Sequence, residues 1–283
     1  MDLQLTGKRA LVTGSSSGIG AAIAKQLAAE GAVVVVHGRD KARTAAVGGE
    51  IRAAGGDSFE VIGELTSDTS ANRVCAEVDS LLGGVDILVN NAGGAGGRNP
   101  ARGKTPGFFD LMPEDWVGAY EHNLVSAVRT IKQLGPGMMD RGWGRIIQIA
   151  SSAATVPSTV NNDYAAAKGA LVTLTVGLSK TLAHTGVTAN TVSPGMILTP
   201  QTLADNSHKE AWLRVYARSR GWDDSLSTEE LEQQWAKEWN VPAGKAGRVE
   251  NITAIVSVLA SPLGGFVTGA NFRVDGGENP SVN

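Results

Sequence analysis

Thr13-Gly14-Ser15-Ser16-Ser17-Gly18-Ile19-Gly20 is the stretch that decides the fold of this chain. It follows the apolar run Arg9–Thr13 and leads into the helical pattern Ile19–Glu30. A strand, a glycine turn and a helix in this order suit a pyrophosphate, because the glycines let the backbone approach and the helix N-terminus offers free N–H groups. We expect ligand contacts from Gly14, Ser15, Ser17, Gly18, Ile19 and Gly20. The spacing is G-x-x-x-G-x-G, not the commoner G-x-G-x-x-G, so a turn that only packs the strand on the helix is the alternative.

The rest of the chain repeats this alternation of short apolar runs and longer helical patterns. Strands are expected at Arg9–Thr13, Val33–His37, Phe59–Ile62, Asp86–Val89, Arg145–Ala150, Thr188–Val192 and Asn271–Val274. Helices are expected at Ile19–Glu30, Lys41–Ala54, Ser70–Leu82, Pro113–Met139, Tyr164–His184 and Glu250–Ala260. Strands that are apolar on both faces indicate a parallel sheet between helices, and right-handed crossovers make it doubly wound. We predict an α/β fold: one Rossmann-type domain over residues 1–283, with a parallel sheet of about seven strands flanked by helices.

Two long stretches interrupt the alternation, and both follow strands. Gly93–Asp110 contains three basic residues, Arg98, Arg102 and Lys104, which either attract an acidic or carrier-linked substrate or belong to a solvated loop. Pro200–Val241 holds four of the six tryptophans: Trp212, Trp222, Trp235 and Trp239. Ser227 and Glu230 have the spacing of a capping box, and Leu231, Trp235 and Trp239 fall on one face of the helix that follows. We predict a helical lid insertion at 200–241, whose tryptophans line an apolar substrate pocket or only pack the lid on the body.

Composition excludes several classes of function. The net charge of −3 does not favour a nucleic-acid or anionic-membrane surface. Cys75 is the only cysteine, and the four histidines are scattered, so the chain has no disulfide and no cluster of metal ligands. Residues 1–9 lack the apolar run of a signal peptide and no segment is apolar enough to span a bilayer, so we expect a cytoplasmic protein.

The ends of the second, third and fourth strands bear on which dinucleotide binds. His37-Gly38-Arg39 follows the second strand, where a 2′-phosphate meets an arginine and a free 2′-hydroxyl meets an acid. Arg39 therefore favours NADP(H), with NAD as the alternative if Arg39 is only a surface charge; Asp40 is better explained as a helix cap. Glu64, with Leu65 beside it, could accept a hydrogen bond from adenine or be a solvated acid. Asn91, Ala92 and Gly93 of the Asn90–Gly93 segment lie where the adenosine ribose would rest, unless this is a simple turn.

Tyr164 and Lys168 are four residues apart in a helical pattern, so their side chains share one face. A phenol with a pKa of about 10 is a poor base near neutrality, and a neighbouring ammonium would lower that pKa into a useful range. Ser151, with Ser152 as its competitor, ends the fifth strand and could donate to a carbonyl oxygen. Asn123, in the fourth helix, either packs or holds a water. An isolated Tyr–Lys pair would more often be simple packing.

These motifs together resemble the short-chain dehydrogenase/reductase family, and are similar to its 3-oxoacyl-(acyl carrier protein) reductase-like branch. The resemblance runs from about Leu5 to Gly277. It rests on T-G-x-x-x-G-I-G at Thr13–Gly20, N-N-A-G at Asn90–Gly93, N-L at Asn123-Leu124, Ser151, Y-A-A-A-K at Tyr164–Lys168, S-P-G-x-I-x-T-P at Ser193–Pro200 and V-D-G-G at Val274–Gly277.

The resemblance implies a role for each matching residue. Tyr164 would exchange a proton with the substrate oxygen, Lys168 would bind the nicotinamide ribose and depress the pKa of the tyrosine, and Ser151 would orient the carbonyl. Further contacts are implied for Asn123, which would hold a relay water, and for the cofactor-binding residues Pro194, Gly195, Ile197 and Thr199. Family members are commonly homotetramers.

Three departures from the family pattern affect these expectations. Glu64 replaces an aspartate, and Ser17 stands where many NADP-preferring members carry a basic residue. The two long stretches exceed the family's usual length, so no relative's substrate can simply be transferred. The resulting hypothesis is an NADP(H)-dependent enzyme that reduces a ketone, a 3-oxoacyl or other carbonyl compound, to a secondary alcohol. The alternatives are an NAD-dependent dehydrogenase of an alcohol such as a sugar or steroid, and a non-catalytic dinucleotide-binding protein.

Overall fold

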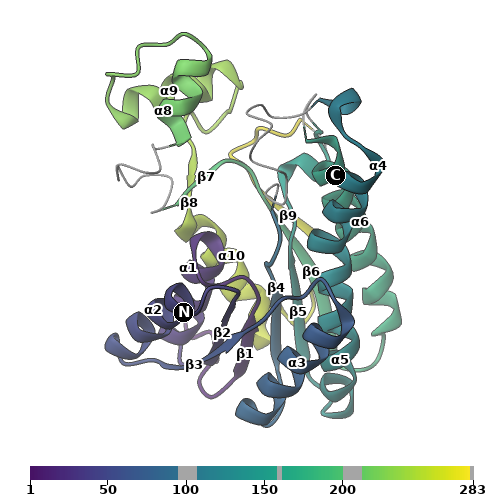
Figure 1. Ribbon diagram of the computed structural model, residues 1–283. Helices are drawn as coiled ribbons and strands as arrows, with labels where there is room; N and C mark the ends of the chain where they lie inside the picture. Colours follow the sequence, from purple (N-terminus) through teal and green to yellow (C-terminus); the bar gives the residue numbers. More distant parts are fainter. Residues whose placement is uncertain (95–106, 158–160, 200–211, 281–283) are drawn as a thin grey trace.

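A parallel seven-stranded sheet forms the centre of the computed structural model, which describes residues 1–94, 107–157, 161–199 and 212–280 (Figure 1). The strand order is β3-β2-β1-β4-β5-β6-β9. The strands are β1 (Arg9–Val12), β2 (Val33–Gly38), β3 (Asp57–Ile62), β4 (Ile87–Asn90), β5 (Gly144–Ile149), β6 (Val187–Pro194) and β9 (Asn271–Val274). This confirms the predicted fold class. The order reverses between β1 and β4, and the crevice at the carboxyl ends of these two strands is where such sheets bind ligands.

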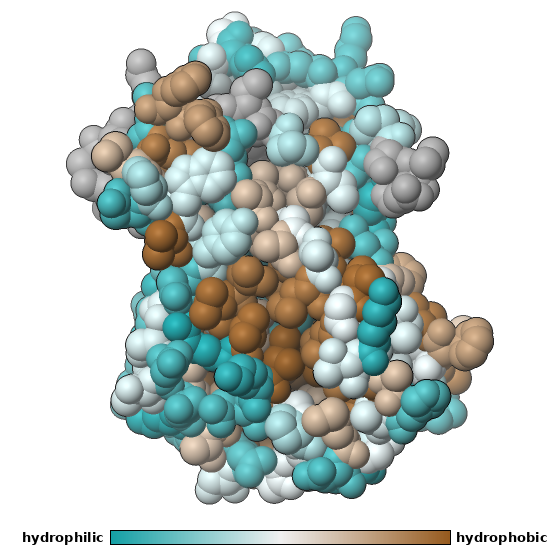
Figure 2. Space-filling model, turned by 90° about the vertical axis from the view of Figure 1, so that its right-hand side faces the viewer, coloured by the Kyte–Doolittle hydropathy of each residue, from teal (hydrophilic) through white to brown (hydrophobic). Residues whose placement is uncertain are grey.

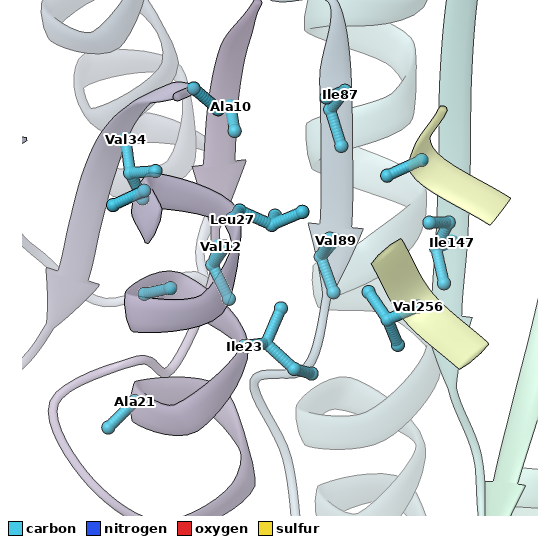
Figure 3. Packing of buried hydrophobic residues seen from close by; sticks show 14 of the residues in the cluster. Ala10, Val12, Ala21, Ile23, Leu27, Val34, Ile87, Val89, Ile147 and Val256 are labelled. Carbon is cyan, nitrogen blue, oxygen red and sulfur yellow. The ribbon is translucent and has the colours of Figure 1, made fainter. Parts of the chain in front are cut away.

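Helices cover both faces of the sheet (Figure 1). They are α1 (Gly18–Ala29), α2 (Lys41–Ala53), α3 (Asp68–Leu82), α4 (Pro113–Tyr120), α5 (Ser126–Asp140), α6 (Asn162–Thr181), α8 (Trp212–Ser219), α9 (Thr228–Glu238) and α10 (Val249–Ala260). Because side chains alternate along a strand, Val12 packs towards α1 and α10 while Leu11 packs towards α3 and α5. Figure 3 shows the first of these two layers, in which Ile23 and Leu27 of α1 meet Val12 and Val89. No helix among the described residues has the length and apolarity needed to cross a bilayer.

The helical stretch predicted at Pro113–Met139 is confirmed in extent, but it is not α-helical throughout. The chain forms α4, then a π-helical turn at Glu121–Val125, then α5. Two side chains bind carbonyl groups of the helix at this turn. The Asn123 amide donates to the Ala119 carbonyl at 3.0 Å, and the Ser126 hydroxyl donates to the His122 carbonyl at 2.8 Å. The wide turn therefore sits at Asn123, one of the predicted site residues.

Most other predicted boundaries differ from the observed ones by one or two residues. The Asp40 cap is confirmed, because its carboxylate accepts a hydrogen bond from the Arg43 backbone at 3.0 Å. The largest difference is at α6, which begins at Asn162 and ends at Thr181 instead of spanning Tyr164–His184. His184 adopts a left-handed conformation with φ at 65°, which ends helical geometry before it. Tyr164 consequently lies in the first turn of α6.

The second long stretch ends in a helical hairpin, α8 and α9, that projects from the body beyond β7 and β8, at the top left of Figure 1. The predicted capping box is confirmed, with Ser227 accepting from the Glu230 backbone and Glu230 accepting from the Ser227 backbone. Leu231 and Trp235 are buried in the hairpin's own core, as expected for one face of α9. The prediction for Trp239 is wrong: this residue follows the helix as its C-cap and is 39% exposed. A short parallel pair, β7 (Ile197–Leu198) and β8 (Gly247–Arg248), joins the hairpin to the body and had no signal in the sequence analysis.

Candidate active site

The glycine turn after β1 has no room for side chains. Gly14 has φ at 63°, and a Cβ added there would lie 2.8 Å from the Cα of Ala92. A Cβ on Gly20 would lie 2.4 Å from the Asn91 amide nitrogen and 2.5 Å from the Gly14 carbonyl oxygen. Glycine is therefore required at both positions, and the exposed backbone between them leads directly into the N-terminus of α1. This cradle fits the diphosphate of a dinucleotide.

Thr13 and Asn91 hold the turn against the end of β4. The Thr13 hydroxyl oxygen accepts from the backbone N–H groups of Asn91 and Ala92, each at 3.0 Å. The Asn91 amide donates to the carbonyl oxygens of Thr13 and Gly14, also at 3.0 Å each. The predicted contact residue Asn91 thus shapes the cradle with its side chain. Thr13 was missed as a site residue, although its place directly before the first glycine was a usable signal.

Ser15 is a predicted ligand contact whose side chain binds within the protein. It is fully buried; its hydroxyl donates to the Val12 carbonyl at 2.7 Å and accepts from the His37 backbone at 2.9 Å. The neighbouring His37 ring accepts a hydrogen bond from the Gly14 backbone through Nδ1, at 3.2 Å. Burial lowers the pKa of His37 to about 4, so the ring is neutral near pH 7 and able to accept this bond. Both side chains brace the turn from the β2 side.

A cavity of about 190 Å³ opens beside the turn and brings together several predicted cofactor contacts. Its lining includes Gly14, Ser17, Arg39, Glu64, Leu65, Ala92 and Gly93. Arg39 and Glu64 form an ion pair at 3.2 Å, with side chains 64% and 40% exposed. Arg43, in the first turn of α2, also lines this cavity and was missed by the sequence analysis. Because Arg43 lies three residues after the Asp40 cap and close to Arg39, its position in the sequence could have indicated that it borders the same cavity.

Tyr164, Lys168 and Ser151 lie together at the carboxyl end of β5. Ser151 hydrogen-bonds the phenol oxygen of Tyr164, and the Lys168 ammonium lies 5.8 Å from the centre of the tyrosine ring. The ammonium donates to the Ile149 carbonyl of β5 at 2.7 Å, which fixes it beneath the tyrosine. The residues come from the end of β5 and the first two turns of α6, as their spacing in the sequence suggested.

The electrostatic balance at Tyr164 differs from the expectation. Burial raises the pKa of the phenol, and the hydrogen bond from Ser151 opposes this rise. Lys168 is itself 3% exposed, and burial lowers the pKa of its ammonium from 10.5 to about 8. The net shift of the Tyr164 pKa is therefore upward, opposite in direction to the expected depression by Lys168, because burial is its largest cause.

Asn123 anchors the segment that follows β4. It is 1% exposed, and its carbonyl oxygen accepts from the Gly94 backbone at 2.8 Å while its amide donates to the Gly94 carbonyl at 3.2 Å. A Cβ on Gly93 would lie 2.5 Å from the Asn123 carbonyl oxygen, so these two residues are in close contact. The side-chain amide of Asn123 is hydrogen-bonded to backbone groups through both its oxygen and its nitrogen. A water held by this residue would therefore have to bind its own backbone groups.

The segment after β6 returns to the glycine turn. Pro194 ends β6, the Gly195 backbone donates to the Val274 carbonyl at 3.0 Å, and Ile197 lies in β7. Thr199 lies over the start of α1, since a Cβ on Gly18 would be 3.9 Å from its methyl group. Of the predicted contacts Pro194, Gly195, Ile197 and Thr199, the last therefore lies beside the glycine turn, and the other three lie on the segment that leads to it. Arg98, Arg102 and Lys104 fall outside the described residues, as does Pro200.

Comparison with known proteins agrees with this geometry. The family model for short chain dehydrogenase matches residues 8–210. D-beta-hydroxybutyrate dehydrogenase from Cupriavidus necator is 35% identical over 96% of this chain and 98% of that protein. The 3-oxoacyl-[acyl-carrier-protein] reductase FabG from Vibrio cholerae is 34% identical over 97% of this chain and 98% of its own length.

Solved structures extend the likeness to the whole chain. L-sorbose reductase from Gluconobacter frateurii, complexed with NADPH and L-sorbose, has a TM-score of 0.87 at 30% identity and covers 100% of both chains. A 7 alpha-hydroxysteroid dehydrogenase complexed with NADH has a TM-score of 0.79 at 31% identity, covering 100% of this chain and 98% of that one. The chain belongs to the short-chain dehydrogenase/reductase family, and is an oxidoreductase with NAD(P)-dependent carbonyl and alcohol chemistry.

Proposed function

We propose that this protein is an NADP(H)-dependent reductase that converts a ketone to a secondary alcohol. The observation that carries the proposal is the Tyr164 phenol, hydrogen-bonded by Ser151 and placed above the buried Lys168 ammonium, at the sheet edge that also holds the glycine turn. The nicotinamide supplies a hydride when bound. The carbonyl carbon of the substrate would accept this hydride, and Tyr164 gives its proton to the carbonyl oxygen, so that the product is a secondary alcohol.

The remaining site residues have supporting roles in this proposal. Ser151 donates to the substrate carbonyl oxygen and orients it towards Tyr164. Lys168 binds the nicotinamide ribose and is an ammonium near pH 7, because its pKa of about 8 lies above that pH. Asn123 keeps the segment after β4 in place. The raised pKa of Tyr164 keeps the phenol protonated, which suits a proton donor and therefore the direction of reduction.

NADP(H) is preferred over NAD(H) in this proposal because two guanidinium groups, Arg39 and Arg43, border the cavity beside the glycine turn, where the adenosine would bind. Arg39 pairs with Glu64, but exposed ion pairs of this kind contribute only about 0–1 kcal/mol, so a 2′-phosphate with two negative charges can displace the carboxylate. Ser17, Gly18, Ile19 and Gly20 would bind the diphosphate, and Leu65 would border the adenine.

The substrate class proposed is a ketone, with a sugar ketone and a 3-oxoacyl thioester as the two forms to compare. L-sorbose reductase supports the first, because its structure, complexed with L-sorbose, matches this chain with a TM-score of 0.87. The acyl reductases and the hydroxybutyrate dehydrogenases support the second. The α8–α9 hairpin is proposed to act as a lid over the substrate, part of the insertion at residues 200–241 in an otherwise single catalytic domain.

A homotetramer is proposed for the assembled protein. Figure 2 shows the side of the molecule that carries α4 and α6, where apolar side chains gather below the middle of the face and polar ones surround them. Val117 of α4 and Val176 of α6 are 65% and 41% exposed, which is consistent with a surface that a second copy would cover. Light scattering after size-exclusion chromatography measures the state directly.

The test of the proposed function is a panel of ketones and alcohols assayed by the absorbance of the reduced cofactor, with NADPH, NADH and their oxidised forms. Turnover of a ketone with a kcat/KM at least about tenfold higher for NADPH than for NADH is expected. Turnover with NAD on alcohols alone would favour the dehydrogenase alternative. Cofactor binding without turnover of any substrate would favour a non-catalytic dinucleotide-binding protein.

A further inference from the structure

An ion pair between Glu232, whose carboxylate is buried, and the half-buried Arg248 connects the α8–α9 hairpin to the body. Glu232 of α9 is 3% exposed, and its carboxylate is bound bidentately by Arg248 of β8, at 2.9 Å and 2.7 Å. Oε1 of Glu232, which accepts from Arg248 at 2.9 Å, also accepts the Ala246 backbone N–H at 2.8 Å. A buried carboxylate with three donors, two of them from one guanidinium, is a rigid junction. It fixes α9 to the start of β8.

The strand β8 in turn pairs with β7, and β7 leads to Thr199, a proposed cofactor contact. Gly247 donates its backbone N–H to the Met196 carbonyl at 2.9 Å, and a Cβ on Gly247 would lie 2.4 Å from the Ile197 side chain. The two strands are therefore in direct contact along Ile197 and Leu198. Thr199 follows at once and lies over Gly18, at the start of α1. Figure 1 shows β7 and β8 as the ribbon between the hairpin and the body.

Adjacent residues of β7 belong to different hydrophobic cores. Leu198 is 2% exposed and packs in the core of the hairpin with Leu231 and Trp235. Ile197 packs against the main core beside α1 and α10. Because a strand alternates its side chains, any shift of the hairpin moves Leu198 and so the backbone on both sides of it. The position of the hairpin and that of Thr199 are thus mechanically linked.

We propose that Glu232 is a positioning residue for the cofactor. Through Arg248 and the β7–β8 pair it holds Ile197–Thr199 over the glycine turn, so that the nicotinamide half of the cofactor meets a preformed contact. The inference rests on the proposed function, since it takes Ile197 and Thr199 as cofactor contacts. It assigns to the insertion a part in cofactor binding, in addition to any contact that it makes with substrate.

The test compares Glu232→Gln with Glu229→Gln, a matched control. Glu229 is exposed on the same helix and acts on Arg248 only through its charge. Titration of NADPH and of NADH, read by cofactor fluorescence, is expected to give a dissociation constant about tenfold higher for Glu232→Gln than for the wild type. Glu229→Gln should stay within about twofold of the wild type, and kcat at saturating cofactor should change by less than about twofold in both.

Two further measurements separate positioning from simple stabilisation. Arg248→Gln should raise the dissociation constant equally, and the double variant Glu232→Gln/Arg248→Gln should add nothing, because both changes break one junction. Hydrogen exchange of the Gly247 amide, measured without cofactor, should be about tenfold faster in Glu232→Gln than in Glu229→Gln. A lower melting temperature with unchanged cofactor affinity and unchanged Gly247 exchange would overturn the proposal. If the wild type binds neither cofactor, the proposed function fails, while the Gly247 exchange still decides whether Glu232 holds β8.

Discussion

Replacing Lys168 by methionine should make the unliganded protein more stable while removing its activity. Burial lowers the pKa of this ammonium from 10.5 to about 8. One pKa unit corresponds to about 1.4 kcal/mol, so keeping the charge buried near pH 7 costs about 3 kcal/mol. Methionine has a similar length and no charge, but it loses the hydrogen bond from the ammonium to the Ile149 carbonyl, worth about 2 kcal/mol for a charged donor. The expected net gain is about 1 kcal/mol in the free energy of unfolding.

The dependence of this gain on pH follows from the same shift. Between about pH 8 and 10.5 the folded protein has released the Lys168 proton and the unfolded chain has not, so the unfolded state binds more protons. Wild-type stability therefore rises with pH in this window relative to the variant. The cost of the buried charge is fully present below pH 8 and is lost as the pH rises towards 10.5. The advantage of Lys168→Met should shrink across the same window.

Urea unfolding of the wild type and of Lys168→Met at a series of pH values from 7 to 10.5 measures this difference, and other titrating groups cancel between the two proteins. Tyr164→Phe is the matched control, because it removes a neighbouring polar group and leaves the ammonium in place. Activity with the best ketone of the panel is recorded on the same samples. A variant that is less stable than the wild type at pH 7, or a stability gap that stays constant with pH, would refute the reasoning.

Three other predictions follow from the described contacts. Tyr164→Phe should lower kcat by at least about a hundredfold and leave the NADPH dissociation constant unchanged; stopped-flow reduction of the ketone checks it, and retained turnover would remove Tyr164 as proton donor. Arg39→Asp should shift the ratio of kcat/KM for NADPH over NADH by about a hundredfold towards NADH; an unchanged ratio would leave Arg39 as a surface charge. The pKa of His37 is lowered to about 4, so between about pH 4 and 6.5 the folded protein binds fewer protons at this residue than the unfolded chain does. The free energy of unfolding therefore keeps its full value above about pH 6.5 and falls by about 3 kcal/mol as the pH drops to 4. His37→Asn should lack that component in urea unfolding, and equal pH profiles for the two proteins would contradict it.

Residues within a short motif could be placed relative to one another from the sequence, but their protonation could not. Tyr164 and Lys168 could be predicted as neighbours because one helical turn separates them, and the structure places them so. Their protonation could not be read in the same way. The pKa of each depends on how much solvent the surrounding elements exclude, and the sequence does not contain that quantity. The expected downward shift of the Tyr164 pKa was wrong for this reason.

Contacts between residues far apart in the chain could not be predicted from the sequence either. Nothing in the order of residues indicates that Glu232 binds Arg248. The π-helical turn at Glu121–Val125 is accompanied by side chains that bind carbonyl groups of their own helix, and hydrophobic periodicity does not indicate such bonds.

The sequence by itself determined the α/β class, the glycine turn and the residues able to carry the chemistry, because these follow from local backbone freedom and from the period of apolar side chains. Tertiary structure alone decided which of those residues are buried, what each one is hydrogen-bonded to, and how the α8–α9 hairpin is fastened to β8. Burial and long-range contact arise when elements far apart in the chain exclude the same water, and only the folded molecule brings them together.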